Sequence, residues 1–292
     1  MGSSFYSSSN RNIRASSSGY YSKSIDDIFE QSKVRRIHES MNPSTARMRE
    51  ARDSENHPNS LPIIIGLDVT GSMGKIPHHL VKDGLPNMIT GIINNGFPDP
   101  QILFLAIGDH IYDYYPLQVG QFESGDAELD MWLTRTYLES GGGGNRHESY
   151  LLAWYFAAFH TVTDNWEKRR KKGFIFTIGD ENCHRELNSR TINDLMGIGA
   201  ERGYNRQELL SLAQEKYHVF HIHLLDGSYG DNPVSDWKHL LGENCIVLRS
   251  YKDVDKTISN IVCSFDNETV EQEEPIADME ESDIEENNDI IL

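Results

Sequence analysis

Residues 63–74 read IIIGLDVTGSMG, an apolar run that ends in an aspartate and continues into a short polar loop. The uninterrupted run at 63–67 predicts a strand that is buried on both faces. Asp68, Thr70 and Ser72 then follow at alternate positions, and a glycine comes after them. A hydrophobic core needs none of these oxygen-bearing side chains. Their spacing therefore predicts a cluster of oxygens aimed at a common point.

Strands and helices alternate along most of the chain beyond this stretch. This alternation predicts an α/β fold, with a doubly wound, mostly parallel central sheet and helices on both faces. A short strand at 115–122 is expected to add one antiparallel edge. The other predicted strands are 62–67, 101–107, 173–178, 217–224 and 245–248, and the predicted helices are about 76–94, 126–139, 147–162, 191–214 in pieces, 233–241 and 252–264.

The composition divides the chain into three parts. Residues 1–58 begin with a Ser-rich stretch and continue into a short possible helix and a polar segment. We expect a flexible N-terminal arm, whose polar segment either lies on the body or forms a linker, and we favour the linker. Residues 59–265 hold the alternating strands and helices and form the predicted domain. The rest, 266–292, contains twelve Asp and Glu residues and no Lys or Arg, which predicts a disordered acidic tail.

Charge and cysteine content exclude several classes of protein. The net charge of −18 makes the chain a poor nucleic-acid binder, because phosphates attract Lys and Arg. Three cysteines without a pairing pattern argue against a disulfide framework and for a reducing compartment. We find no run of about 18 apolar residues and no apolar signal-peptide core, so we expect no membrane partner and a cytoplasmic location.

A second acidic cluster follows another predicted strand. The strand at 173–178 ends in Gly179, Asp180 and Glu181. In an open α/β sheet, ligands lie outside the carboxyl ends of the strands, so Asp180 is expected near the loop that carries Asp68. Hydroxyl and carboxylate oxygens are the ligands that hard cations prefer, and Mg²⁺ keeps several waters or other ligands beside them. The sequence therefore predicts a site for Mg²⁺ or Mn²⁺.

The motif DVTGSMG resembles the Asp-x-Thr/Ser-x-Ser signature of von Willebrand factor A (vWA) domains. The order of strands, helices and motifs is similar to that of the family over about residues 60–265. The sequence around these motifs resembles a subfamily found in bacterial and phage genomes. The resemblance implies a metal-ion-dependent adhesion site (MIDAS) in a doubly wound α/β fold. It assigns Asp68, Thr70 and Ser72 to the first metal-binding loop and Asp180 to the last.

The middle loop of the family usually supplies a threonine, and this chain has none there. The glycine-rich stretch ESGGGGNRHESY, residues 139–150, offers Asn145 or Glu148 in its place. We favour Asn145, because the predicted helix at 147–162 would place Glu148 in its first turn, where a carboxylate suits the helix N-terminus. Capping of the following helix is the simplest alternative role for Asp68 and Ser72, although a cap needs only one such residue.

Three functions follow as hypotheses. In the first, the chain is a binding module without enzymatic activity, whose bound ion is completed by an Asp or Glu of a protein partner; the resemblance adds that intracellular vWA proteins often work beside an AAA+ ATPase. In the second, it is a metal-dependent hydrolase with Asp180 or Glu181 as base. In the third, it is a structural component of a bacterial or phage assembly.

Other motifs give weaker signals. The glycine-rich loop lacks a following Lys-Ser/Thr pair and does not follow the first strand, which disfavours a nucleotide site. His221 and His223 lie on one face of a predicted strand near Cys183 and His184, but the spacing differs from that of zinc sites, so we expect a polar strand face. The basic cluster at 168–172 ends a predicted helix, where positive charge suits the helix dipole.

Overall fold

The computed structural model describes residues 4–139 and 145–265. Six strands form the central sheet, and all neighbours are parallel except the edge pair β3 and β4. The architecture is therefore the doubly wound, mostly parallel α/β fold that the sequence predicts, with β4 as the antiparallel edge. The strand order is β12 (Cys245–Leu248), β11 (Tyr217–Leu224), β7 (Gly173–Gly179), β2 (Leu61–Asp68), β3 (Pro100–Ile107) and β4 (Leu117–Val119).

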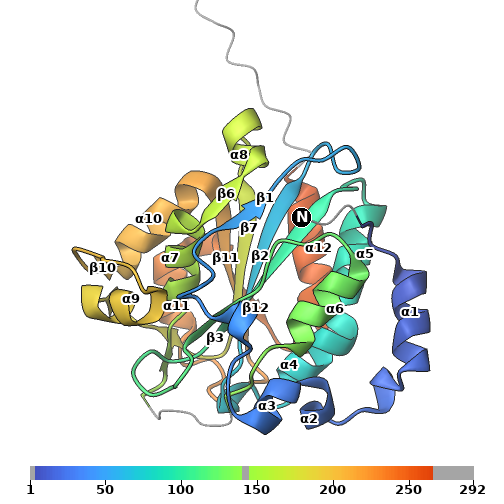
Figure 1. Cartoon of the computed structure of the whole chain (residues 1–292). Helices are drawn as coiled ribbons and strands as arrows, with labels where there is room; N and C mark the ends of the chain where they lie inside the picture. Colours follow the sequence, from blue (N-terminus) through green and yellow to red (C-terminus); the bar gives the residue numbers. More distant parts are fainter. Residues whose placement is uncertain (1–3, 140–144, 266–292) are drawn as a thin grey trace, which may run out of the picture.

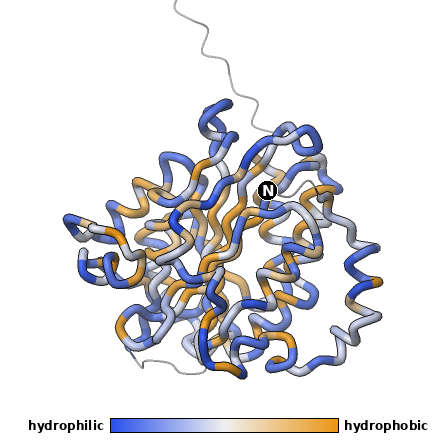
Figure 2. Tube along the Cα trace, in the orientation of Figure 1, coloured by the Kyte–Doolittle hydropathy of each residue, from blue (hydrophilic) through white to orange (hydrophobic). Residues whose placement is uncertain are grey.

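Strand β2 lies in the interior of the sheet and is buried on both faces. Ile63 and Ile65 belong to one hydrophobic cluster and Ile64 to the other, as the two-residue period of a strand requires. Figure 2 shows the resulting concentration of hydrophobic residues along the central strands. This double burial explains why the sequence here is a continuous apolar run.

Helices cover both faces of the sheet (Figure 1). The first layer, which packs on Ile63 and Ile65, contains α4 (Ile76–His79), α5 (Leu85–Asn94), α6 (Asp126–Thr134) and α12 (Val254–Ser264). The second layer, on the side of Ile64, contains α7 (Leu151–Phe159), α9 (Ser189–Met196), α10 (Arg206–Lys216) and α11 (Val234–Leu241). No helix among residues 4–139 and 145–265 is both long and apolar enough to cross a membrane.

Several predicted helices have different limits in the structure. A π-helical segment, Leu80–Gly84, separates α4 from α5 within the predicted helix at 76–94. The predicted helix at 147–162 begins only at Leu151, because residues before it form a two-residue strand. That strand, β5 (His147–Glu148), pairs with β8 (Asn182–Cys183); the other short pairs are β1 (Arg49–Ala51) with β6 (Thr161–Thr163), and β9 (Glu186–Leu187) with β10 (Tyr204–Asn205).

The N-terminal segment is packed on the domain, which differs from the flexible arm that we expected. Arg11 in α1 (Ser8–Ser17) is 3% exposed, pairs with Asp130 of α6 at 2.9 Å and donates to the carbonyl oxygens of Val81 and Lys82. Strand β1 pairs with β6 farther along the segment. Ion pairs, strand pairing and a few buried apolar side chains, such as Ile28 and Phe29, therefore hold a segment whose aliphatic content is low. Its other helices are α2 (Ile25–Ile28) and α3 (Glu30–Val34), and α8 (Asp164–Arg169) follows β6.

Replacing Arg11 tests this packing. We expect Arg11→Ala to lower the free energy of unfolding by about 1.5–3 kcal/mol, because it removes hydrogen bonds to a charged group and leaves buried carbonyl oxygens without their donor. The control is Arg190→Ala, whose side chain is 92% exposed and which should change stability by less than about 0.5 kcal/mol. Urea unfolding measures both values. Equal stability of the two variants would show that the contacts of Arg11 do not stabilise the fold.

Candidate functional site

The first loop of the candidate site is organised around the carboxylate of Asp68, at the end of β2. Asp68 is completely buried. Its Oδ1 accepts hydrogen bonds from the backbone N–H and the hydroxyl of Thr70 at 2.9 and 2.6 Å, and its Oδ2 accepts one from the hydroxyl of Tyr150 at 2.9 Å. Both oxygens are thus held in fixed positions, Oδ1 by the loop that follows β2 and Oδ2 by Tyr150 at the start of α7.

The second half of the site comes from the end of β7. Ser72 lies in the 3-10 turn Gly71–Met73 and donates a hydrogen bond from Oγ to Oδ1 of Asp180 at 2.7 Å. The Thr70 and Ser72 hydroxyl oxygens are 3.2 Å apart. The structure therefore brings together four of the predicted ligands, Asp68, Thr70, Ser72 and Asp180, from the ends of two adjacent strands.

A third strand end supports Asp180. Ser228, in the loop after β11, donates its backbone N–H to Oδ2 of Asp180 at 2.6 Å and its hydroxyl to the carbonyl oxygen of Ser72 at 2.9 Å. Side-chain atoms at Gly179 would collide with the Tyr150 hydroxyl, and at Gly227 with the Asp180 side chain. Glycine is required at both positions because the loops approach so closely. Sequence reasoning did not identify Tyr150 or Ser228.

Glu148 also belongs to this cluster of acids. It lies in β5 rather than in a helix, so the helical argument that favoured Asn145 is wrong. Glu148 is 2% exposed, and its Oε2 atom has no hydrogen-bond partner. Burial, followed by repulsion from Asp68 and Glu181, raises the pKa of Glu148 to about 12. This shift favours the neutral, protonated form of Glu148.

The neighbouring carboxyl groups are perturbed in the same direction. Burial, with Asp180 next in importance, raises the pKa of Asp68 to about 7. Burial and the charges of Asp68 and Asp180 raise the pKa of Glu181 to about 8. Carboxylates gathered at one point, with other carboxylates as their main electrostatic neighbours, form a region of negative potential. Such a region suits a divalent cation.

Asn145 points to a different group of residues. Its amide Nδ2 donates to Oδ2 of Asp109 at 2.6 Å, and its Oδ1 accepts the backbone N–H of His147 at 3.1 Å. Asp109 in turn contacts His184 and lies beside His110. The structure thus places Asn145 with Asp109 rather than with the four oxygen ligands. Sequence reasoning missed Asp109 and His110, although they follow the predicted strand at 101–107.

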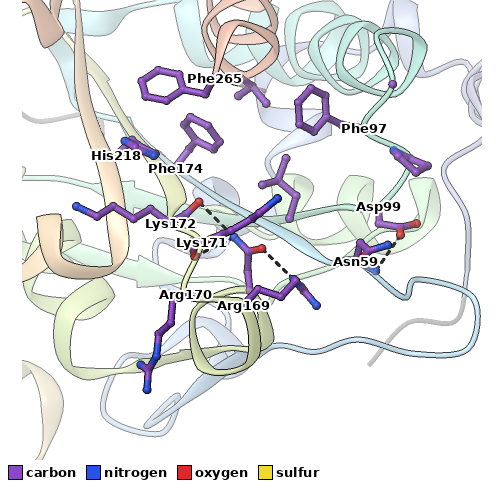
Figure 3. A pocket seen from close by; sticks show the side chains of 15 residues that line it. Asn59, Phe97, Asp99, Arg169, Arg170, Lys171, Lys172, Phe174, His218 and Phe265 are labelled. Carbon is purple, nitrogen blue, oxygen red and sulfur yellow. Dashed lines mark hydrogen bonds between the residues drawn. The ribbon is translucent and has the colours of Figure 1, made fainter. Parts of the chain in front are cut away.

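A cavity of about 590 Å³ lies at the opposite edge of the sheet (Figure 3). It combines aromatic side chains, including Phe97, Phe174 and Phe265, with the basic run at 169–172. Most of the residues that line it precede or begin β2, β3, β7 and β11, and Val262 and Phe265 come from the end of α12, so the cavity lies at the amino ends of the parallel strands. Ligand sites in this class of sheet lie at the carboxyl ends, where the acidic cluster is found.

Comparison with known proteins gives similarities of overall structure. No protein-family model and no curated protein sequence matches the chain. Proximal thread matrix protein 1 from the mussel byssus has a TM-score of 0.47 and 11% identity, covering 70% of this chain and 47% of that one. The pilus adhesin SpaC from Lactobacillus rhamnosus GG, in its open conformation, gives 0.48 and 10%, covering 74% and 31%. The VWA domain of SpRpn10 gives 0.41 and 12%, covering 68% and 95%. The chain thus spans less than half the length of the first two.

The raised pKa of Asp68 predicts how stability depends on pH. Folding raises this pKa from 3.8 to about 7, so the folded protein holds a proton that the unfolded chain has released. The free energy of unfolding should therefore fall as pH rises from about 4 to about 7. With a chelator present, we expect the wild-type melting temperature to fall more between pH 5 and pH 8 than that of Asp68→Asn, which cannot titrate there. Equal falls would show that Asp68 does not titrate in this range.

Proposed function

We propose that this chain is a vWA-like module that binds Mg²⁺ or Mn²⁺ through Asp68, Thr70, Ser72 and Asp180 and thereby captures a carboxylate of a protein partner. The observation that supports this most directly is the 2.7 Å hydrogen bond between Ser72 and Asp180, which joins the two strand-end loops. It gathers two carboxylates and two hydroxyls, the ligand chemistry that hard cations prefer.

The hydrogen bonds around the cluster fit this role. In the metal-free protein, the hydroxyls of Thr70 and Ser72 donate to the carboxylates that would share an ion with them. Tyr150 and Ser228 donate to the Oδ2 atoms of Asp68 and Asp180, and so orient each carboxylate without using the Oδ1 atoms that the loop hydroxyls contact. When bound, the ion would supply a Lewis-acidic centre that a partner's Asp or Glu can complete.

The charge count favours capture of a further carboxylate. Asp68 and Asp180 carry two negative charges when ionised, which balance a divalent cation. Glu148 is almost completely buried among acids, so it adds no third charge while it keeps its proton. Its unpartnered Oε2 then offers a hydrogen-bond donor beside the cluster. A neutral, donor-bearing site attracts an incoming carboxylate better than an anionic one.

An AAA+ ATPase is the partner that the family resemblance suggests, and we propose it on that ground alone. A cytoplasmic location belongs to the same proposal and agrees with the buried free thiols of Cys183 and Cys245. A metal-dependent hydrolase that uses Asp180 or Glu181 as base is the alternative. The burial-raised pKa of Glu181, about 8, is the property that favours this second function. A structural component of a bacterial or phage assembly is the third.

Manganese binding tests the main proposal. We expect Mn²⁺ to enhance water-proton relaxation in the presence of the wild-type protein, and Asp68→Ala or Asp180→Ala to abolish the enhancement, because each removes a charged ligand. Acetate should then lower the wild-type enhancement, since a captured carboxylate displaces water from the ion. A hydrolase would also bind the ion, so a positive acetate effect is the result specific to carboxylate capture.

The matched control is Asp194→Ala, which removes an aspartate whose side chain is 72% exposed in α9. It should bind Mn²⁺ as the wild type does. If Asp68→Ala binds the ion as well as this control, the metal assignment is wrong. If the ion binds but acetate has no effect, metal binding stands and carboxylate capture does not.

The roles of Asn145 and Glu148 give a second test. Because Asn145 is engaged with Asp109 and Glu148 is neutral, Asn145→Ala and Glu148→Gln should each change Mg²⁺ affinity by less than the about tenfold loss typical of groups that orient a metal ligand. Titration calorimetry measures both. A tenfold or larger loss in Glu148→Gln would show that Glu148 binds the ion as a carboxylate. The same loss in Asn145→Ala would restore Asn145 as a ligand.

A further inference from the structure

A second group of metal-ligating side chains lies beside the acidic cluster. Asp109, His110 and His184 offer one ligand atom each, and these three atoms all lie within 4.8 Å of one another. Nε2 of His184 is 2.7 Å from Oδ1 of Asp109, and the ring centroids of His110 and His184 are 4.5 Å apart. Donors that converge at this distance can share one ion after small side-chain movements.

The three residues come from the ends of two strands that belong to different sheets. Asp109 and His110 follow β3, and His184 follows β8, so 75 residues separate the carboxylate from the second imidazole. Asp109 is 1% exposed, whereas the two histidines are partly exposed. The site is therefore anchored in the protein at its carboxylate and open to solvent at its imidazoles.

Neighbouring groups hold the ligands in place. Nδ1 of His110 lies 2.7 Å from the hydroxyl of Ser149, so a proton on Nδ1 leaves Nε2 with a lone pair for a metal. Oδ2 of Asp109 accepts the Asn145 amide, and Oδ1 also accepts the backbone N–H of Ile111 at 3.0 Å. Metal-binding residues in proteins are typically oriented by such outer hydrogen bonds.

We propose that Asp109, His110 and His184 form a binding site for Zn²⁺ or a similar transition-metal ion, separate from the proposed Mg²⁺ site. Two imidazoles and one carboxylate suit zinc, cobalt or nickel, whereas Mg²⁺ prefers oxygen ligands. Three protein ligands leave one position of a tetrahedral zinc ion open to solvent or to a partner. The ring of His147 lies near the site, with its centroid 5.4 Å from that of His184.

The location of the site suggests what the ion would do. The backbone N–H of His184 donates to the carbonyl oxygen of Glu148 at 3.3 Å, within the short β5–β8 pairing. An ion held by Asp109 and His184 would tie the loop after β3 to the segment that carries Glu148. Zinc bound by Asp109, His110 and His184 would thus restrict the segment that carries Glu148, beside the acidic cluster. It would use none of the four oxygen ligands proposed for Mg²⁺.

Zinc and cobalt titrations test the site. We expect the chelator-stripped protein to bind one Zn²⁺ by calorimetry, and to give the visible absorption of tetrahedral Co²⁺ with that ion. His110→Gln and Asp109→Asn should each weaken Zn²⁺ binding by more than the about 10–100-fold seen for outer hydrogen-bond partners, and Ser149→Ala by about that amount. His110→Gln leaves the Asp109–His184 contact intact, so it keeps the test valid if Asp109→Asn unfolds.

The controls separate this site from the Mg²⁺ site. His239→Gln removes an exposed histidine of α11 and should bind Zn²⁺ as the wild type does. Asp68→Ala should keep Zn²⁺ binding, excess Mg²⁺ should not displace Zn²⁺, and His110→Gln should keep Mg²⁺ binding. If His110→Gln binds Zn²⁺ as tightly as His239→Gln, the proposal is wrong and the Asp109–His184 contact only links two loops. Loss of Zn²⁺ binding in Asp68→Ala would also overturn the separation.

Discussion

The burial of two aspartates at one edge of the sheet is the constraint on which the rest of the site depends. Taking an ionised carboxylate out of water is costly unless hydrogen bonds or an opposite charge compensate it. Asp68 and Asp180 are both completely buried, and each receives hydrogen bonds on both of its oxygens. The donors come from two loops, after β2 and β11, and from the start of α7, so each of these must keep its position for the aspartates to remain in place.

This constraint explains features that packing alone does not. Tyr150 must reach Asp68 past the backbone of β7, which leaves no room for a side chain at Gly179. The loop after β11 must bring the Ser228 N–H onto Asp180, which requires glycine at 227. The hydrogen bonds to the two buried aspartates therefore require a glycine at positions 179 and 227. The aspartates thus constrain the sequence of the loops around them.

Much of the fold could be predicted because its signals are local. The two-residue burial period of β2 and the alternation of strands with helices are readable in short windows, and the strand-end rule then brings Asp68 and Asp180 together. The packing of the N-terminal segment could not be predicted in this way. It depends on Arg11 meeting Asp130, 119 residues away, and on β1 pairing with β6.

The other incorrect predictions also concern residues whose structure depends on contacts with distant parts of the sequence. Strand β5 is two residues long and exists only because β8 lies beside it, so the sequence before the apolar helix at 151–159 looked helical as far back as 147. That error placed Glu148 on a helix and made Asn145 the better ligand. The group formed by Asp109, His110 and His184 likewise joins two short loops that are far apart in the sequence. No local sequence pattern indicates that these loops meet.

The two clusters share a boundary, and their chemistry makes them depend on each other. The side-chain amide of Asn145, at the end of the glycine-rich loop, donates to Asp109. This loop therefore contacts the group formed by Asp109, His110 and His184. Glu148 faces the acidic side, while its carbonyl oxygen accepts the N–H of His184. Any group that fixes His184 therefore also fixes the backbone of Glu148. Under the proposed function, the protonation of Glu148 would set the charge that a cation between Asp68 and Asp180 presents to solvent. With Glu148 neutral, two carboxylates would balance a divalent ion, and an incoming carboxylate would meet no excess negative charge. With Glu148 ionised, the same carboxylate would be repelled, so the proposed capture of a carboxylate depends on the burial of this single acid.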